Sequence, residues 1–285
     1  MSVPLQVARV DVGQIAMNYW EAPIADAATI VLVHGGGESA SSFLRVAARL
    51  SGMFRVIVPD LPGHGDSDWL SEGRYLRDTM VDLLADFIDN VVGPRSAALV
   101  GQSLGARIAL GVAAARPDLV NSLTMIDTAP ETAKSGREAL AQTMSLRPFP
   151  DLEFAARTLG LVSGETATSD ELDRARRHTR VLEDNRVDLK FDPYFSAMVQ
   201  EPALIEATRG TPAEIRRDAK RVGVPTLIVR GSNSELVSEI AAMEFSTLFD
   251  QGYLHTVRDA GHLVNRDNPA GLSDALGWFH HRDHQ

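Results

Sequence analysis

Short apolar runs alternate with longer stretches of helical periodicity along most of the chain. After two alternating segments at 7–12 and 15–20, the apolar runs lie at 29–33, 54–58, 96–100, 122–126, 224–229 and 253–257. The helical stretches between and after them lie at 41–50, 76–92, 103–115, 239–249 and 269–280. Apolar strands separated by helices are typical of a parallel sheet with helices on both faces. The pattern therefore predicts an α/β fold that opens with an antiparallel hairpin.

This alternation stops between residues 132 and 217. Charged helical stretches such as 169–181 replace the β-branched runs there, and no parallel strand fits the pattern. We expect residues 131–217 to form a helical cap inserted into one core domain, made of residues 1–130 and 218–285. A chain of 285 residues is suited to one catalytic domain with such an insertion.

Composition and charge restrict the class of protein. The chain is 44% hydrophobic and 23% charged, as globular proteins are, and no apolar run approaches a membrane span. A net charge of −10 argues against nucleic acid as a partner. Residues 1–11 alternate like a strand and not like a signal peptide, and the chain has no cysteine for disulfides or thiolate chemistry. We expect a cytoplasmic monomer or homodimer that acts on a small molecule, without nucleic acid or membrane.

A serine stands at the sharpest turn that the sequence predicts. The segment Gly101–Gly105 reads Gly-Gln-Ser-Leu-Gly and joins the apolar run 96–100 to an alanine-rich helical stretch, 106–115. Glycines two residues before and after Ser103 permit a tight strand–turn–helix, because a Cβ there would meet neighbouring backbone. The turn exposes the serine hydroxyl and puts the amide of Leu104 at a helix N-terminus, which favours an oxyanion. We predict Ser103 as a nucleophile and Leu104 as an oxyanion-hole donor.

Three further segments complete a resemblance to the α/β-hydrolase superfamily. An apolar strand runs into the glycine-rich loop His34–Gly37, residues 60–67 read Asp-Leu-Pro-Gly-His-Gly-Asp-Ser, and residues 259–262 read Asp-Ala-Gly-His. Together with the serine turn, and in this order, these segments resemble that superfamily over nearly the whole chain. The resemblance implies a mostly parallel, eight-stranded sheet with helices on both faces and an inserted cap.

The same resemblance implies roles for single residues. His262 follows a strand and a glycine, where the superfamily has its general base, and Gly36 matches the second oxyanion-hole donor. His34 and His64 match positions that orient backbone, so we expect both to be structural. We expect His280, in the polar C-terminal tail, to be solvated.

Two carboxylates compete for the third position of the catalytic triad. The family order of serine, acid and histidine requires an acid between Ser103 and His262. Glu235 lies in the loop after a late core strand, where the family usually has an aspartate that is one methylene shorter. Asp127 ends the run 122–126, where some members carry their acid instead. The sequence favours Glu235, keeps Asp127 as the alternative and leaves Asp259 a distant third, which we expect to brace the histidine loop instead.

The chemistry predicted from these residues is two-step acyl transfer through an acyl-enzyme on Ser103. No metal or organic cofactor is expected, since no cluster of histidines and carboxylates has ligand spacing. We expect the substrate to be a carboxylic ester or lactone with a small or medium apolar group. The candidate substrate-binding residues are Gly37, Trp69, Phe154 and Met198.

Three other functions use the same scaffold. The glycine loop 35–37 resembles that of carbon–carbon hydrolases acting on vinylogous diketones, but Leu263 stands where that subfamily has a tryptophan. A cofactor-independent oxygenase would consume oxygen without cleaving esters. A non-catalytic receptor would bind its ligand tightly without turnover.

Overall fold

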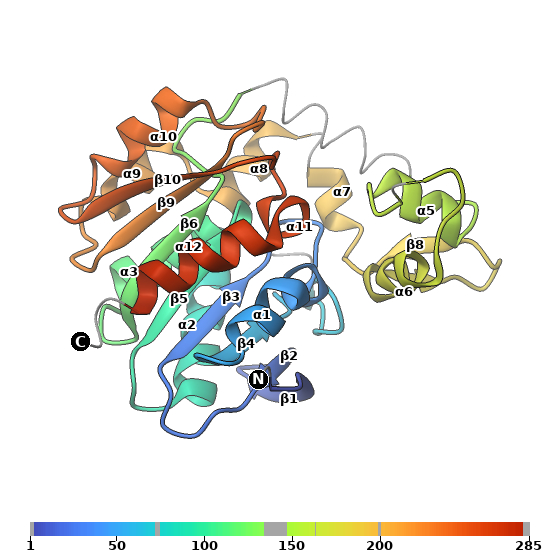
Figure 1. Cartoon of the computed structure of the whole chain (residues 1–285), viewed down its shortest axis with the longest axis horizontal. Helices are drawn as coiled ribbons and strands as arrows, with labels where there is room; N and C mark the ends of the chain where they lie inside the picture. The colour runs from blue at the N-terminus through green and yellow to red at the C-terminus, as the bar shows by residue number, and fades with distance from the viewer. Residues whose placement is uncertain (1–2, 72–74, 134–146, 163, 199–200, 282–285) are drawn as a thin grey trace.

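One eight-stranded sheet forms the centre of the molecule (Figure 1). The computed structural model of the chain describes residues 3–71, 75–133, 147–162, 164–198 and 201–281. The strands of the sheet, in spatial order, are β1 (Gln6–Val12), β2 (Ile15–Ala22), β4 (Arg55–Pro59), β3 (Thr29–Val33), β5 (Ala97–Gln102), β6 (Val120–Ile126), β9 (Thr226–Gly231) and β10 (Gly252–Val257). β2 pairs antiparallel with β1 and β4, and the remaining pairs are parallel. The predicted fold class is confirmed.

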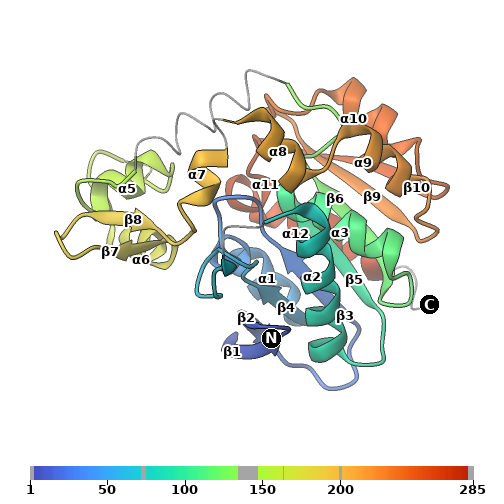
Figure 2. The same ribbon diagram turned by 180° about the vertical axis from the view of Figure 1, so that it is seen from behind.

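Helices cover both faces of this sheet (Figures 1 and 2). One face packs against α1 (Leu44–Leu50), α11 (Val264–Asp267) and α12 (Pro269–His281), with a short 3-10 helix, η1 (Ala40–Phe43), before α1. The other face packs against α2 (Arg77–Val92), α3 (Leu104–Ala115) and α10 (Glu239–Ser246). Each layer buries the apolar side of its helices, which is the main stabilising contribution in such a fold.

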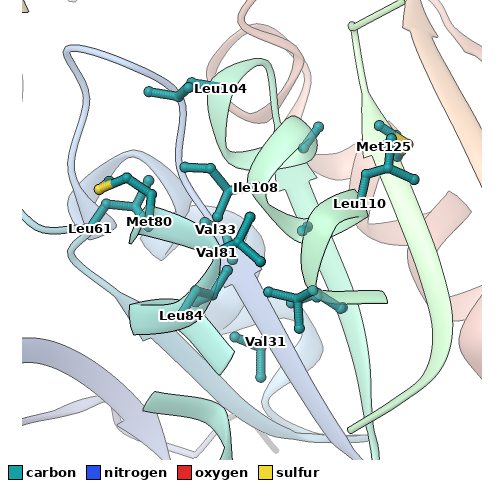
Figure 3. Packing of buried hydrophobic residues seen from close by; sticks show 14 of the residues in the cluster. Val31, Val33, Leu61, Met80, Val81, Leu84, Leu104, Ile108, Leu110 and Met125 are labelled. Carbon is teal, nitrogen blue, oxygen red and sulfur yellow. The ribbon is translucent and has the colours of Figure 1, made fainter. Parts of the chain in front are cut away.

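The packing of α2 and α3 on the sheet is tight because α3 is rich in small residues. Figure 3 shows Ile108 of α3 near Val33 of β3 and Val81 of α2, whereas Leu110 of α3 lies beside Met125 of β6. A Cβ on Gly111 would collide with Val81 Cγ2, so this glycine sets the close approach of the two helices. α3 is thereby fixed along its length, and its first residue, next to Ser103, is fixed with it.

The insertion between β6 and β9 is helical, with one small hairpin. Its elements are α5 (Leu152–Thr158), α6 (Ser169–His178), β7 (Thr179–Val181), β8 (Val187–Leu189), α7 (Tyr194–Met198), α8 (Pro202–Arg209) and α9 (Pro212–Ala219). The elements from α5 to β8 form a lobe beside the core, whereas α8 and α9 pack on α2 and α3 (Figure 2). The predicted helix over 169–181 ends at His178, because the three residues after it pair with β8.

The insertion is attached to the core through the loop that follows β4. Gly65 N donates to Lys190 O at 2.7 Å, and Asp192 N donates to Gly63 O at 2.8 Å. Tyr75 Oη, in the core, donates to the Asp192 carboxylate at 2.8 Å. Backbone and side-chain bonds therefore fix one end of the lobe. None of the helices in the described ranges is long and apolar enough to cross a membrane.

Candidate active site

The candidate site lies at the carboxyl ends of the parallel strands, as expected for an open α/β sheet. β3 leads into the loop His34–Gly37, β5 into Ser103, β6 into Asp127, β9 into the loop from Ser232, and β10 into the loop that contains His262. Because β5 lies between β3 and β6, the turn at Ser103 is flanked by the loops that follow both neighbouring strands.

Ser103 has the strained backbone that the sequence predicts for a nucleophile turn. Its φ of 51° and ψ of −110° are unusual for a non-glycine residue. A Cβ on Gly101 would lie 2.5 Å from the backbone of Ala106, and a Cβ on Gly105 would lie 2.6 Å from Val33 O. Only glycine fits at either position, so the two glycines are what allow the chain to turn this sharply.

His262 is held by a buried aspartate. Its Nδ1 lies 2.8 Å from Asp127 Oδ2, and the Asp127 side chain is fully buried. The same Oδ2 accepts a hydrogen bond from Ser234 Oγ at 2.6 Å, and Oδ1 accepts one from Gly231 N at 3.1 Å. These donors stabilise a buried carboxylate and fix its direction, since both oxygens are engaged.

The structure differs from the sequence prediction at this acid. Glu235, the favoured candidate, is exposed to solvent, and the hydrogen bond to His262 comes from the alternative, Asp127. In the loop after β9 it is Ser234 that turns inward to the carboxylate of Asp127. Its neighbour Glu235 is exposed and makes no contact with His262 in the described structure. The longer side chain of a glutamate therefore has no effect on the geometry of this contact.

Backbone and amide contacts connect the serine turn to both of these residues. Ser103 N donates to Ile126 O at 3.0 Å, one residue before Asp127. Gln102 Nε2 donates to the carbonyl oxygen of His262 at 2.6 Å. In the part of the chain that the structure describes, the Ser103 hydroxyl makes no hydrogen bond to the His262 ring. Such contacts are often loose in an enzyme without substrate and tighten on binding.

The backbone amides of Leu104 and Gly36 are the candidates for an oxyanion hole. Leu104 is the first residue of α3, so its amide cannot bond within the helix. Gly36 lies beside it, because a Cβ on Gly36 would be 3.3 Å from Leu104 Cδ2. The next amide in the loop, Gly37 N, donates to His64 Nε2 at 3.1 Å and is therefore already engaged. Gly36 and Leu104 are the pair that can serve as donors.

Comparison with known proteins gives the family. Residues 30–275 match the model of the alpha/beta hydrolase family. The chain belongs to the alpha/beta hydrolase family. Esterase Rv0045c of Mycobacterium tuberculosis is 28% identical over 282 residues, which cover 95% of this chain and 88% of that protein. Several relatives that match most of the chain are named as hydrolases, and this chain is an enzyme of the alpha/beta hydrolase class.

Two other relatives are named as hydrolases of different substrates. The 2-(acetamidomethylene)succinate hydrolase of Mesorhizobium japonicum is 29% identical over 269 residues, covering 92% of this chain and 90% of that protein. A crystal structure of E-2-(acetamidomethylene)succinate hydrolase matches with a TM-score of 0.82 and 27% identity, over 98% of this chain and 100% of that one. The 2-hydroxy-6-oxo-6-(2'-aminophenyl)hexa-2,4-dienoic acid hydrolase of Metapseudomonas resinovorans is 26% identical over 270 residues, covering 93% and 88%.

Two buried histidines of this hydrolase hold its loops in place. His34 Nε2 accepts from Leu61 N at 2.9 Å while Nδ1 lies 2.8 Å from Gly35 O, so the ring is neutral with its proton on Nδ1. Burial lowers the pKa of His34 to about 4. Burial also lowers the pKa of His64, which bonds Gly37 N and Pro62 O in the same manner. Both are structural residues beneath the glycine loop.

The expectation for His280 is wrong. His280 lies on α12, and its side chain is buried against β6. Its Nδ1 is 2.8 Å from Ser122 Oγ and its Nε2 is 2.9 Å from Thr124 Oγ1. Burial lowers its pKa to about 3, so the ring stays neutral in the folded hydrolase. The helix ends at His281, close to the predicted end, but its last turn packs on β6 and buries His280, which the run of histidines does not reveal.

The candidate substrate-binding residues belong to different segments of the chain. Trp69 is 41% exposed and stacks under Arg180 of the insertion at 5.1 Å. Phe154 is 45% exposed at the start of α5, with its ring 6.2 Å from that of the buried Phe149. Met198 is the last residue of α7, and its side chain lies outside the described part of the structure. Gly37 contributes its amide to His64.

Sequence reasoning missed two polar residues beside the site. Ser234 was overlooked although it precedes Glu235 and carries a donor that a carboxylate can use. Glu38 directly follows the glycine loop and is buried, with Arg266 Nη1 3.9 Å from its Oε1. Burial raises the pKa of the Glu38 carboxyl, and the positive charge of Arg266 opposes this. A carboxylate next to three glycines is a signal that could have been noted.

No group of histidines and carboxylates within the described ranges could hold a metal ion. The groups that this arrangement brings to one edge of the sheet are a hydroxyl, an imidazole, a carboxylate and backbone amides.

Proposed function

We propose that this chain is a serine hydrolase that cleaves a carboxylic ester or a lactone of a small or medium apolar substrate. Ser103 is the nucleophile, His262 the general base and Asp127 the acid of the triad. The observation that carries the proposal is the 2.8 Å contact between His262 Nδ1 and the buried Asp127, at the sheet edge where Ser103 occupies a strained turn.

The direction of that contact determines the chemistry of the imidazole. An ionised Asp127 can only accept, so Nδ1 of His262 carries the proton and Nε2 keeps a free lone pair. Nε2 takes the proton of the Ser103 hydroxyl as its oxygen attacks the substrate carbonyl. Asp127 then stabilises the imidazolium without taking up its proton.

The tetrahedral intermediate carries a negative oxygen, which the amides of Leu104 and Gly36 stabilise. One such donor contributes about 3 kcal/mol to transition-state stabilisation in a comparable site. When the intermediate collapses, the leaving alkoxide takes the proton from His262. A water molecule next gives a proton to Nε2 and attacks the acyl-enzyme, and Ser103 recovers that proton as the acid product leaves.

Support for the substrate class is indirect. An esterase is among the relatives, and the triad with its oxyanion hole is sufficient for ester cleavage without further groups. Phe154 and Trp69 give the insertion and the neighbouring loop exposed aromatic surface, which is suited to an apolar group. We infer that the acyl or alcohol group of the substrate contacts this aromatic surface.

The test is the reaction of purified protein with short p-nitrophenyl esters under single-turnover conditions. We expect a burst of p-nitrophenol that disappears in Ser103→Ala, with the two proteins compared at equal concentration and equal folded fraction. Ester turnover by Ser103→Ala at the wild-type rate would contradict the proposal.

Carbon–carbon bond hydrolysis is the second candidate. The similarity to the dienoic acid hydrolase and the loop Gly35–Gly37 favour it, whereas Leu263 departs from the tryptophan expected after the histidine. A hydrolase of this kind would remove the absorbance of a ring-fission dienoate and show no burst with p-nitrophenyl esters. The two substrates offered to one preparation therefore distinguish the candidates.

A further inference from the structure

Helix α3, which begins directly after Ser103, carries a single charged residue. α3 reads LGARIALGVAAA, and Arg107 is 3% exposed in the interior of this otherwise uncharged helix. A buried guanidinium has to be matched by acceptors, because an ion without them is costly in the interior. Arg107 lies one turn after the nucleophile, and its amide donates to Ser103 O at 3.3 Å. What the guanidinium contacts is therefore directly relevant to the site.

The acceptors come from the peptides that follow Asp127. Nη2 donates to Ala129 O at 2.5 Å and to Pro130 O at 3.0 Å, and Nε donates to Thr128 Oγ1 at 3.3 Å. All three consecutive residues after the acid are thus bonded to one side chain. Because the guanidinium is planar and rigid, it fixes these groups relative to α3 more firmly than separate contacts would.

Asp127 needs such support because its own backbone is strained. Its φ is 46°, in the left-handed region that residues with a side chain occupy uncommonly, although aspartate does so more often than most. On the preceding side, β6 and the bond from Asp127 N to Val229 O, at 2.7 Å, hold the chain. On the following side, the Arg107 guanidinium bonds the three residues that come directly after Asp127, and further along the chain Ala133 N donates to Leu236 O at 2.9 Å.

The remaining nitrogen of Arg107 reaches the insertion. Nη1 donates to Gly210 O at 3.3 Å and to Arg209 O at 3.5 Å, in the turn between α8 and α9. Arg77 lies behind this turn, where it donates to Arg107 O at 3.2 Å and to Asp218 of α9 at 2.7 Å. Helix α3, the residues that follow Asp127 and the turn between α8 and α9 are therefore all bonded to the Arg107 side chain.

We propose that Arg107 is a positioning residue that directs the Asp127 carboxylate at His262 by fixing the three residues after it. The proposal rests on the function proposed above, since it concerns the same triad. The contact of Arg107 with Gly210 also ties the insertion to this anchor, so that a displacement of α8 and α9 is transmitted to the acid.

The experiment compares Arg107→Lys with wild type by proton NMR. The hydrogen on Nδ1 of His262, bonded to Asp127, gives a resonance far downfield, assigned by its absence in His262→Gln. We expect Arg107→Lys to lose or broaden this resonance, because an ammonium cannot bridge the same acceptors. Arg116→Met, which removes an exposed arginine directly after the same helix, is the matched control and keeps the resonance.

Kinetics and rescue separate positioning from folding. We expect Arg107→Lys to lower kcat about 10- to 100-fold with KM nearly unchanged, as small misplacements of catalytic groups do. In Arg107→Ala, a low and non-denaturing concentration of guanidinium chloride should restore part of kcat, whereas sodium chloride of equal ionic strength should not. If Arg107→Lys does not fold, Thr128→Val, which removes only the Nε contact, takes its place in the NMR comparison.

An unchanged downfield resonance in a folded variant would overturn the proposal, whatever the loss of stability. The NMR readout needs no substrate, so the two proposals can fail separately. Loss of the resonance in Arg107→Lys, together with no serine-dependent esterase activity in wild type, would reject the proposed function and keep the positioning role of Arg107.

Discussion

At the scale of single residues, the site depends on backbone positions that few residues can occupy. Ser103 and Asp127 both have positive φ angles, and both stand directly after a strand of the sheet. Gly101 and Gly105 make room for the first of them, and Arg107 bonds the chain after the second. The geometry of the catalytic groups is thus determined by packing that surrounds them and not by the catalytic side chains themselves.

Replacement of Gly105 tests this dependence. A Cβ at Gly105 would lie 2.6 Å from Val33 O and closer still to His34 O, so Gly105→Ala has to displace β3 or α3. We expect a loss of about 1 to 3 kcal/mol in the free energy of unfolding, measured by urea denaturation. Gly223→Ala is the control, because a Cβ there has open space around it and should change stability by less than about 0.5 kcal/mol. Equal stabilities for the two variants would show that the turn tolerates a side chain.

The identity of the acid is tested by paired amide substitutions. Asp127→Asn keeps the shape of the side chain but allows an amide to donate to His262, which disfavours the productive tautomer. We expect ester turnover to fall about 10⁴-fold, as for the aspartate of a comparable triad, while Glu235→Gln stays within about twofold. The measurement is kcat on the best p-nitrophenyl ester at matched protein concentration. The reverse order of effects would reinstate Glu235.

Local motifs explain which site residues the sequence could predict. The turn around Ser103 and the loop that carries His262 are each one continuous segment of sequence. Their glycines mark positions where the backbone packs too closely for a side chain or turns sharply. The acid could not be chosen, because Asp127 and Glu235 stand in separate loops, and only the fold decides that Ser234 turns inward and Glu235 outward. Arg107 left one signal, a lone charge in an apolar helix.

At the scale of secondary-structure elements, a buried ion pair connects the core to the end of the insertion. Arg77 of α2 and Asp218 of α9 lie 2.7 Å apart, with 6% and 5% of their side chains exposed. In α9, Arg216 forms a second pair with Glu131, which is exposed to solvent. One helix therefore offers both a buried and an exposed ion pair for comparison.

Removal of one buried partner should cost far more than removal of an exposed one. Arg77→Met leaves the Asp218 carboxylate buried with Arg217 as its remaining ion-pair partner among the described residues, and we expect the free energy of unfolding to fall by about 3 kcal/mol. Arg216→Met should cost less than about 1 kcal/mol, since solvent screens the exposed pair. Thermal and urea unfolding of the two variants gives the comparison. A similar small loss in both would show that the buried pair does not hold α9 in place.

Periodicity explains which elements the sequence could predict. Every strand of the main sheet corresponds to an apolar run, and α1, α2, α3, α10 and α12 correspond to helical stretches of ordinary length, whereas the four-residue helix α11 was not predicted. The hairpin of β7 and β8 was missed because strands of three residues are too short to show alternation. The boundaries of the insertion at residues 131 and 217 stay a prediction, and α9 packs on α3 of the core.

At the scale of the whole molecule, the buried histidines connect folding to pH. Burial lowers the pKa of His34 to about 4 and that of His280 to about 3, from 6.5. These rings stay neutral in the folded protein, while in the unfolded chain they bind a proton below their ordinary pKa. Stability is therefore lost as the pH falls below 6.5, and the loss continues toward the folded-state pKa values.

His280 allows this effect to be isolated. Between pH 7 and pH 5 its shift contributes a loss of about 2 kcal/mol in the free energy of unfolding. We expect His280→Leu to be less stable than wild type at neutral pH, because Ser122 and Thr124 lose their partner, yet less sensitive to acid by about this amount. His255→Leu, at an exposed position of β10, should keep the wild-type pH dependence. The measurement is the free energy of unfolding of all three proteins in urea at both pH values. An equal change with pH in all three would refute the link between buried His280 and the loss of stability in acid.

The most direct test of the proposed function is the mass of the protein after mixing with a short p-nitrophenyl ester. We expect acid-quenched wild type and Glu235→Gln to carry one added acyl group, located on the peptide that contains Ser103. Ser103→Ala should remain unmodified, and Asp127→Asn should acquire the group far more slowly. An acyl group on another residue, or ester cleavage with no covalent intermediate at all, would contradict a serine hydrolase built on Ser103, His262 and Asp127.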